Sequence, residues 1–262
     1  MLTASLLAVM FSAWLQNCWA GLLGAVLGGL LMSLFFAWLH LYKDSDLIIT
    51  GLALNTMASG GTVYLLYLVC GDKGTSRLLP SINLPNVELP LIRHIPVLGP
   101  VLSGHNILTY LALVAVFLCW VLVFRSRLGL RIRAVGFNPN AAASVGISVR
   151  RVKFEALLLS GLFASLGGAF MSMGYLSYFA RDMMAGRGDI SIAAATLADG
   201  HCLSTLLASL GFGTANAASI TLATMNLKAD LVAMIPYLVT VIGLVIVSAR
   251  KQAKARKLQA DT

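Results

Sequence analysis

Residues 20–41 read AGLLGAVLGGLLMSLFFAWLHL and contain no charged side chain. A helix needs about 20 consecutive apolar residues to cross the hydrocarbon core of a bilayer, so this stretch alone predicts a membrane-spanning helix. The run also contains Gly21, Gly24, Gly28 and Gly29. Small residues let helix backbones approach closely in lipid, where packing drives association, so these glycines predict tight contacts with neighbouring helices.

The composition extends this interpretation to the whole chain. Of the 262 residues, 58% are apolar and 11% charged, the mean hydropathy is +0.86, and soluble domains carry about 25% charged residues. No separate soluble domain is expected. The predicted fold class is an all-α polytopic membrane protein, with about seven to eight transmembrane or half-membrane helices in one bundle over residues 1–249.

Apolar runs between charged or Pro/Gly breaks predict the individual segments. They are 3–16, 20–41, 47–70, 106–124, 155–177, 189–198, 203–223 and 231–249. The first is interpreted as a short membrane segment, because it lacks the basic region and cleavage pattern of a signal peptide. The segment 189–198 is too short to cross alone, so with 203–223 it predicts a broken or hairpin element around 199–201.

The positions of the cations predict the orientation, because Lys and Arg near span ends are retained in the cytoplasm. The loop 125–154 and the tail 250–262 are rich in Lys and Arg. Both are expected to be cytoplasmic, in a multi-pass protein of the bacterial inner (plasma) membrane with a cytoplasmic C-terminus. The connection 71–104 mixes both charges and carries five prolines, so it is expected to be an irregular external loop.

The sequence does not support nucleic-acid binding, metal binding or nucleotide binding. The net charge of +9 does not predict nucleic-acid binding, because the cations lie between spans and no basic surface carries stacking aromatics. The four cysteines and the histidines have no metal-binding or disulfide spacing. No phosphate-binding loop is present: GDKGTSR at 71–77 and GFGTAN at 211–216 have the wrong spacing. We expect no catalytic residue, metal or cofactor.

The stretch 128–149, LGLRIRAVGFNPNAAASVGISV, predicts a short exposed helix on the cytoplasmic face. Asn138 suits the N-cap, Pro139 the first helical position and Gly146 the end. Such a helix can serve as a rigid element that a partner subunit binds and moves together with the flanking spans. The alternative is a surface helix that touches anionic lipid headgroups.

This loop resembles the cytoplasmic coupling segment of ABC transporter permeases of the branched-chain amino acid/simple-sugar class. The likeness is strongest to the nucleoside and simple-sugar group that works with basic-membrane-lipoprotein-like binding proteins. Further matches follow in order: DLIITGLALNTMASG at 46–60, LLSGLFASLGGAFMSMGYLSYFARDMMAGRGDISIAAA at 158–195, and IPYLVTVIGL at 235–244. The chain departs from the family at DGHC, 199–202, and at its start, where family members carry a further helix.

The resemblance implies a permease subunit of an ATP-driven importer for nucleosides or simple sugars. It implies as partners a cytoplasmic ATP-binding subunit, a second permease subunit that is a paralogue, an external solute-binding lipoprotein and the membrane lipids. ATP hydrolysis then belongs to a partner. The residues expected to couple to the ATPase are Asn138, Pro139, Asn140, Ala141, Ala142 and Gly146.

Polar residues inside spans predict the translocation path, because a membrane-embedded polar group needs a partner, water or ligand. Asn55, Thr56 and Ser59 are the leading candidates, followed by Asn216 and Thr221. The alternative for each is a structural hydrogen bond between helices.

Two other functions remain open at this point. One is an intramembrane serine hydrolase with Ser59 and His201 as its dyad, although no nucleophile motif surrounds the serine. An ion-driven secondary transporter requires inverted repeats and ionisable groups within spans, and the sequence has neither in clear form.

Overall fold

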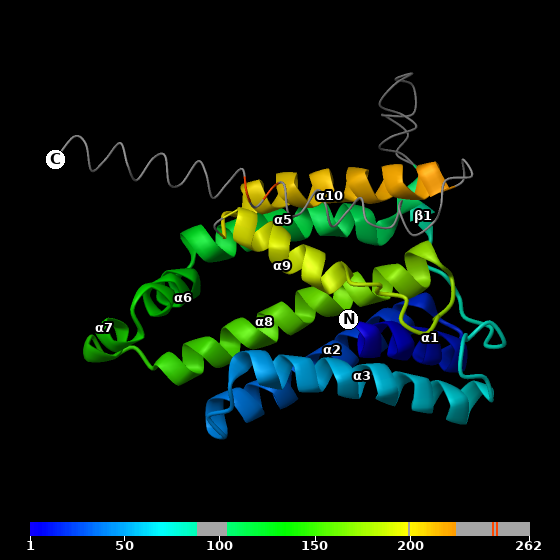
Figure 1. The fold of residues 1–262 in the computed structure, drawn as a ribbon, viewed down its shortest axis with the longest axis horizontal. Coiled ribbons are helices and arrows are strands. Elements are labelled where there is room, and N and C mark those ends of the chain that lie inside the picture. The colour runs from blue at the N-terminus through cyan, green and yellow to red at the C-terminus, as the bar shows by residue number, and fades with distance from the viewer. Residues whose placement is uncertain (88–103, 199, 224–242, 244, 246–262) are drawn as a thin grey trace, which may run out of the picture. The chain divides into compact units, whose positions relative to one another are not determined.

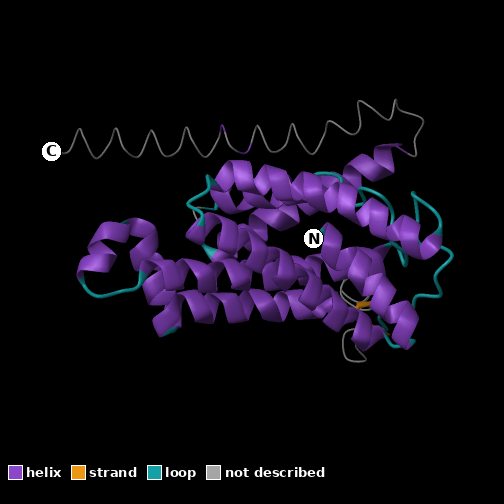
Figure 2. Ribbon diagram, turned by 90° about the horizontal axis from the view of Figure 1, so that it is seen from below, coloured by secondary structure: helices purple, strands orange, loops and turns teal. Residues whose placement is uncertain are grey.

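The computed structural model describes residues 1–87, 104–198, 200–223, 243 and 245. The chain divides into two compact units, Met1–Ala185 and Gly186–Thr262. The described part is almost entirely helical (Figure 2), which confirms the predicted all-α class.

Seven helical elements and a short strand pair make up the described part of the first unit (Figure 1). The helices are α1 (Leu2–Leu15), α2 (Cys18–Tyr42), α3 (Leu47–Cys70), α5 (Ile107–Arg125), α6 (Arg127–Phe137), α7 (Pro139–Ser144) and α8 (Val149–Ala169), which continues as the π-helix η1 (Phe170–Tyr175). Strand β1 (Asn86–Val87) pairs antiparallel with β2 (His105–Asn106), with Asn86 opposite Asn106. The second unit contains α9 (Arg187–Leu197) and α10 (Cys202–Ala223).

Five helices in the described part of the chain are long and apolar enough to cross a membrane: α2, α3, α5, α8 with η1, and α10. Helix α1 is apolar but shorter. The polytopic membrane fold is therefore confirmed. The predicted segment 231–249 lies outside the described residues except for 243 and 245, and the tail 250–262 lies outside them entirely.

The start of α8 differs from the prediction of 155. The helix begins at Val149, and Arg150, Arg151 and Lys153 lie in its first turns. Lys and Arg are good helix formers, so the helix extends past the membrane-facing stretch. The charge boundary in the sequence marked the expected membrane edge and not the helix end.

Helices α9 and α10 confirm the predicted hairpin element. Helix α9 has 11 residues, a length of about 16 Å that is too short to cross a bilayer. The chain then turns through Gly200, whose φ of +72° favours glycine, and α10 packs back against α9.

Helices α2 and α8 approach each other closely in the first unit. A Cβ added to Gly29 would meet the Cβ of Ser165 and the carbonyl oxygen of Gly161, and a Cβ on Gly161 would meet Ser33. On another side of α2, Gly28 faces Leu7 of α1. The predicted packing role of the α2 glycines is confirmed.

A strap, residues 71–87, ties one end of the first unit together. Ser76 exchanges hydrogen bonds with Phe179: its Oγ accepts from the Phe179 amide at 2.8 Å, and its amide donates to the Phe179 carbonyl at 2.9 Å. The Leu84 amide donates to the Met173 carbonyl at 3.3 Å, and Ser12 Oγ on α1 donates to the Ile82 carbonyl at 2.9 Å. The ends of α1, α3 and η1 therefore meet at the strap, and α6 and α7 lie at the opposite end (Figure 1).

The α2–α8 contact can be tested with Gly29→Ala. The added methyl group has no room against Ser165, so we expect the variant to lose about 1–3 kcal/mol of stability through overpacking. The matched control is Gly51→Ala on α3, where a Cβ meets nothing within 4 Å and a neutral or slightly stabilising effect is expected. The midpoint of thermal unfolding in detergent, followed by helical circular dichroism, measures both. Equal midpoints for the two variants would contradict the described contact.

Candidate functional site

Helix α7 is the predicted short helix after Asn138, and it lies at the end of the first unit opposite the strap. Asn138 is its N-cap: the side-chain Oδ1 accepts hydrogen bonds from the amides of Asn140 at 3.0 Å and Ala141 at 3.1 Å. Pro139 occupies the first turn, and Gly146, with φ +83°, lies just beyond the helix. The short capped helix predicted from these residues is confirmed.

Helix α7 is held by a small apolar cluster. Ala142 is buried with Val135 of α6 and Val152 of α8, and Ile132, Ile147 and Val149 pack around them. Ala142 thus faces inward, whereas Asn138, Pro139, Asn140, Ala141 and Gly146 are exposed. Helices α6, α7 and α8 therefore share one apolar cluster.

Two exposed apolar side chains flank α7 and were not singled out from the sequence. Phe137, just before the N-cap, is 91% exposed, and Val145, at the C-cap, is 78% exposed. Both side chains are available for contact with a partner. The sequence signal was available, since Phe137 precedes the N-cap Asn138 and Val145 precedes Gly146, where the helix was predicted to end.

A sharp junction sets the direction of α6. Ser126 Oγ accepts from the Gly129 amide at 3.0 Å and donates to the Leu122 carbonyl at 2.6 Å. A Cβ at Gly129 would collide with the carbonyl oxygen of Leu122, so glycine permits this approach. The Arg133 guanidinium lies over the Phe124 ring, 5.1 Å from its centroid, and fastens α6 back onto α5.

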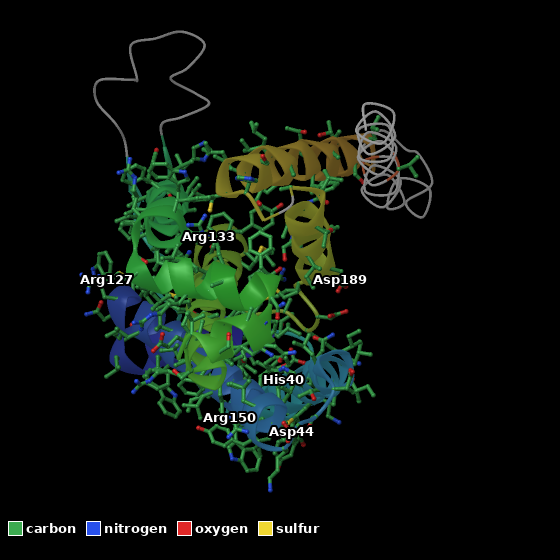
Figure 3. All side chains as sticks on the ribbon, turned by 90° about the vertical axis from the view of Figure 1, so that its left-hand side faces the viewer. His40, Asp44, Arg127, Arg133, Arg150 and Asp189 are labelled. Atoms are coloured by element: carbon green, nitrogen blue, oxygen red, sulfur yellow. The ribbon has the colours of Figure 1, made fainter. Side chains whose placement is uncertain are left out.

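Positive charge collects at the end that carries α7. Figure 3 looks onto this end and labels Arg127, Arg133 and Arg150. In the described part of the first unit, the cations here are Lys43, Arg125, Arg127, Arg131, Arg133, Arg150, Arg151 and Lys153, against the carboxylates Asp44, Asp46 and Glu155. The strap end is closer to balance, with Lys73, Arg77 and Arg181 against Asp72 and Asp182. The two ends of the helices therefore differ in net charge.

The leading path candidates lie together on α3. Asn55, Thr56 and Ser59 are all exposed in the first unit, and Asn55 and Ser59 are one helical turn apart. Thr56 Oγ1 donates to the Leu52 carbonyl of its own helix at 3.0 Å, so its hydroxyl proton is already used. The buried stripe of α3, which includes Leu54 and Leu66, packs on the other side.

The remaining path candidates form a separate set on α10, in the second unit. Asn216 is half-buried and Thr221 is exposed, with the Thr221 Oγ1 donating to the Ala217 carbonyl at 2.9 Å. Of the five spanning helices in the described residues, α3 and α10 are the least apolar. The two helices that carry the path candidates are thus the ones least suited to lipid on all sides.

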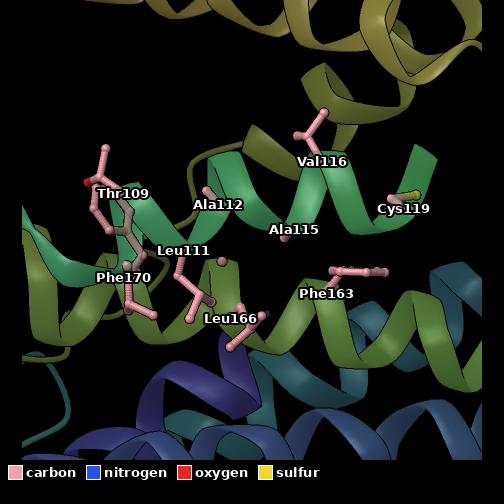
Figure 4. Close-up of a pocket in the computed structure, with 11 residues that line it drawn as sticks. Thr109, Leu111, Ala112, Ala115, Val116, Cys119, Phe163, Leu166 and Phe170 are labelled. Atoms are coloured by element: carbon pink, nitrogen blue, oxygen red, sulfur yellow. The ribbon is translucent and has the colours of Figure 1, made fainter. Parts of the chain in front are cut away.

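An apolar hollow of about 500 Å³ lies between α5 and α8 (Figure 4). Phe163 and Leu166 of α8 and Phe170 of η1 line it opposite Leu111 and Ala112 of α5. A polar solute would lose its hydrogen bonds with water there and gain almost none in return. The hollow therefore does not replace the polar faces of α3 and α10 as a path candidate.

Comparison with known protein families gives a match over almost the whole chain. The model of the family described as branched-chain amino acid transport system / permease component matches residues 1–247. No solved structure matches the chain.

Three similar proteins are permeases by name. The guanosine ABC transporter permease protein NupQ of Bacillus subtilis is 32% identical over 86% of this chain and 72% of its own length. The nucleoside ABC transporter permease protein NupC of Lactococcus lactis is 35% identical over 74% of this chain and 61% of its own length. The putative glucose ABC transporter permease protein TsgC13 of Haloferax volcanii is 27% identical over 88% of this chain and 69% of its own length.

The chain therefore spans about two thirds of the length of these relatives. A second permease protein from each of the three organisms also matches, over 39%, 29% and 67% of this chain. Similar permeases thus occur as pairs within one organism.

The cap of α7 can be tested with Asn138→Ala. The change removes the acceptor for two backbone amides, so we expect α7 to lose about 1 kcal/mol of local stability. Hydrogen exchange at the amides of residues 140–144 measures this and should become faster. Asn140→Ala is the matched control, because it deletes an exposed side chain of the same kind that does not cap the helix. Unchanged exchange in Asn138→Ala would contradict the capping role.

Proposed function

The chain belongs to the family of permease components of branched-chain amino acid transport systems, and on that premise we propose that it forms one transmembrane half of an ATP-driven importer. The proposed solutes are nucleosides or simple sugars, since the similar proteins are named for guanosine, nucleosides and glucose. The observation that carries the proposal is the capped helix α7, presented on the cationic end of a multi-pass permease fold.

We assign the end that carries α7 to the cytoplasm. The imbalance of eight cations to three carboxylates at this end supports the assignment, because Lys and Arg near span ends are retained inside. The strap then faces outward. With the bacterial inner membrane as the location and the C-terminus in the cytoplasm, α7 is available to a cytoplasmic ATP-binding subunit.

The proposed mechanism is alternating access driven through α7. Closure of the ATP-binding subunits pushes the exposed Phe137 and Val145, and the shared cluster around Ala142 passes the movement to α6 and α8. ATP hydrolysis occurs in the partner, and this chain contributes the moving path. Residues Asn138, Pro139, Asn140, Ala141 and Gly146 form the rest of the contact.

We further propose two other partners. The occurrence of similar permeases as pairs supports a paralogous second permease subunit that completes the path. An external solute-binding lipoprotein would deliver solute to the strap end. Asn55 and Ser59 of α3 would offer hydrogen bonds to hydroxyl and base groups of the solute, and Asn216 and Thr221 of α10 are separate candidates for the path.

The alternatives are less well supported. The matches are to ABC transporter permeases, which favours an ATP-driven importer over an ion-driven secondary transporter and over a serine hydrolase built on Ser59 and His201.

Coupling can be tested with the double variant Phe137→Ser and Val145→Ser. Loss of two apolar side chains from the contact should weaken association with the ATP-binding subunit roughly tenfold or more. Copurification of the ATP-binding subunit and ATP-dependent uptake into proteoliposomes measure the effect. Leu130→Ser is the control, because Leu130 is also an exposed apolar residue, on α6 away from α7. If the double variant assembles and transports like the wild type, the role of α7 is wrong.

The path can be tested with Asn55→Leu combined with Ser59→Ala. A solute polar group left without its partner costs about 1–3 kcal/mol, so uptake should fall about tenfold while association with the ATP-binding subunit stays unchanged. Uptake of labelled guanosine and of labelled glucose by the reconstituted complex measures the change and reports which solute is carried. Met57→Leu, an apolar exchange on the same exposed stretch of α3, is the control. Full uptake in the double variant would remove α3 from the path.

A further inference from the structure

A second hollow, of about 340 Å³, lies where the last turn of α2 meets the first turns of α8. Its lining residues are His40, Leu41, Asp44, Ser45, Val149, Arg150 and Lys153. Figure 3 shows His40, Asp44 and Arg150 grouped together and apart from Arg127 and Arg133. We call this hollow the α2–α8 pocket.

The charged side chains of the pocket do not neutralise one another directly. Arg150 and Lys153 supply two cations and Asp44 one carboxylate, and within the part of the chain that the structure describes no ion pair joins Asp44 to either cation. The His40 ring has a partner within the pocket, since its Nδ1 lies 2.9 Å from the Ser45 carbonyl oxygen. The pocket therefore presents positive and negative groups side by side, with one positive charge in excess.

Aromatic residues place the pocket at the depth of lipid headgroups. Trp38 and Tyr42 lie on the last turns of α2 and are 45% and 58% exposed. Lys43 lies over the Trp38 ring at 5.6 Å and Arg150 over the Tyr42 ring at 5.2 Å. Exposed Trp and Tyr beside cations at the end of a span are typical of the membrane–water interface.

We propose that the α2–α8 pocket binds the headgroup of a zwitterionic aminophospholipid, such as phosphatidylethanolamine. The phosphate lies against Arg150 and Lys153, because cations without a carboxylate partner are suited to charge-assisted hydrogen bonds with phosphate. The primary ammonium lies against Asp44. The apolar Leu41 and Val149 adjoin the first part of the acyl chains.

A lipid fits these observations better than a protein partner does. The pocket opens beside exposed aromatics of a spanning helix, and the exposed apolar groups suited to a protein partner, Phe137 and Val145, belong to the α7 region. A headgroup with only negative charge would leave Asp44 facing an anion, which is unfavourable. The inference requires this end of α2 to lie at a membrane surface and does not depend on the proposed transport activity.

The test is a lipid titration of the purified full chain in detergent, with bound lipid counted by native mass spectrometry. We expect phosphatidylethanolamine to bind at least about threefold more tightly than phosphatidylglycerol, as expected for one additional partly exposed ion pair. It should also bind more tightly than phosphatidylcholine, because a quaternary ammonium has no N–H group to donate to Asp44. Soluble phosphoethanolamine should compete. Competition by inorganic phosphate alone, with no preference among lipids, would show a free-phosphate site and overturn the proposal.

Variants assign the charges to their roles. Arg150→Gln with Lys153→Gln should weaken both phosphatidylethanolamine and phosphatidylglycerol about threefold or more, whereas Asp44→Asn should remove only the preference for phosphatidylethanolamine. Arg151→Gln is the matched control, since Arg151 is an exposed neighbour on α8 that does not line the pocket. An equal loss in Arg151→Gln would indicate general surface charge. Normal lipid binding in the Arg150/Lys153 variant, with reduced copurification of the ATP-binding subunit, would indicate a protein contact instead; either outcome overturns the proposal.

Discussion

The first unit depends on the close approach of α2 and α8 at Gly29 and Gly161. Lipid tails are as apolar as the helices, so burial of apolar surface gives two spans little reason to associate, and contact between backbones must supply the attraction. Ser33 and Ser165 fill the crossing without holding the helices apart. This crossing fixes α8 against α2 over its middle turns.

Helix α8 and η1 together form one continuous element from Val149 to Tyr175, 27 residues long, or about 40 Å at helical rise. At one end Val152 shares a cluster with α7, and at the other Met173 receives a hydrogen bond from Leu84 of the strap. The element thus joins the cationic end to the strap end through the α2 crossing. The π-helix is a wider, less regular turn, and such turns are often places where helices rearrange. The proposed movement of α7 would therefore reach the opposite end of the unit along this element.

Local features of the fold were predictable from the sequence, and long-range ones were not. Long runs without charged residues located α2 and α3 within two residues, and the cap at Asn138 located α7. The start of α8 was misplaced, since charge marks the membrane edge and not the end of hydrogen bonding. The pairing of Ser76 with Phe179, about a hundred residues apart, and the meeting of His40 with Arg150 had no local signal. The exposure of Phe137 also required the arrangement of α6, α7 and α8.

The polar groups of the chain satisfy their charge or their hydrogen bonds in different ways. Thr50, Thr56 and Thr221 donate to backbone carbonyls one turn earlier, so each hydroxyl has a hydrogen bond close to it along the chain. The cations gather at one end, where water and headgroups solvate them. Asn55 differs from both classes, because an amide offers two donors and an acceptor and a helix backbone in regular hydrogen bonding has little to give it. An exposed Asn on one of the least apolar spans therefore requires a polar surface opposite it, which either a neighbouring helix or the proposed solute path can supply.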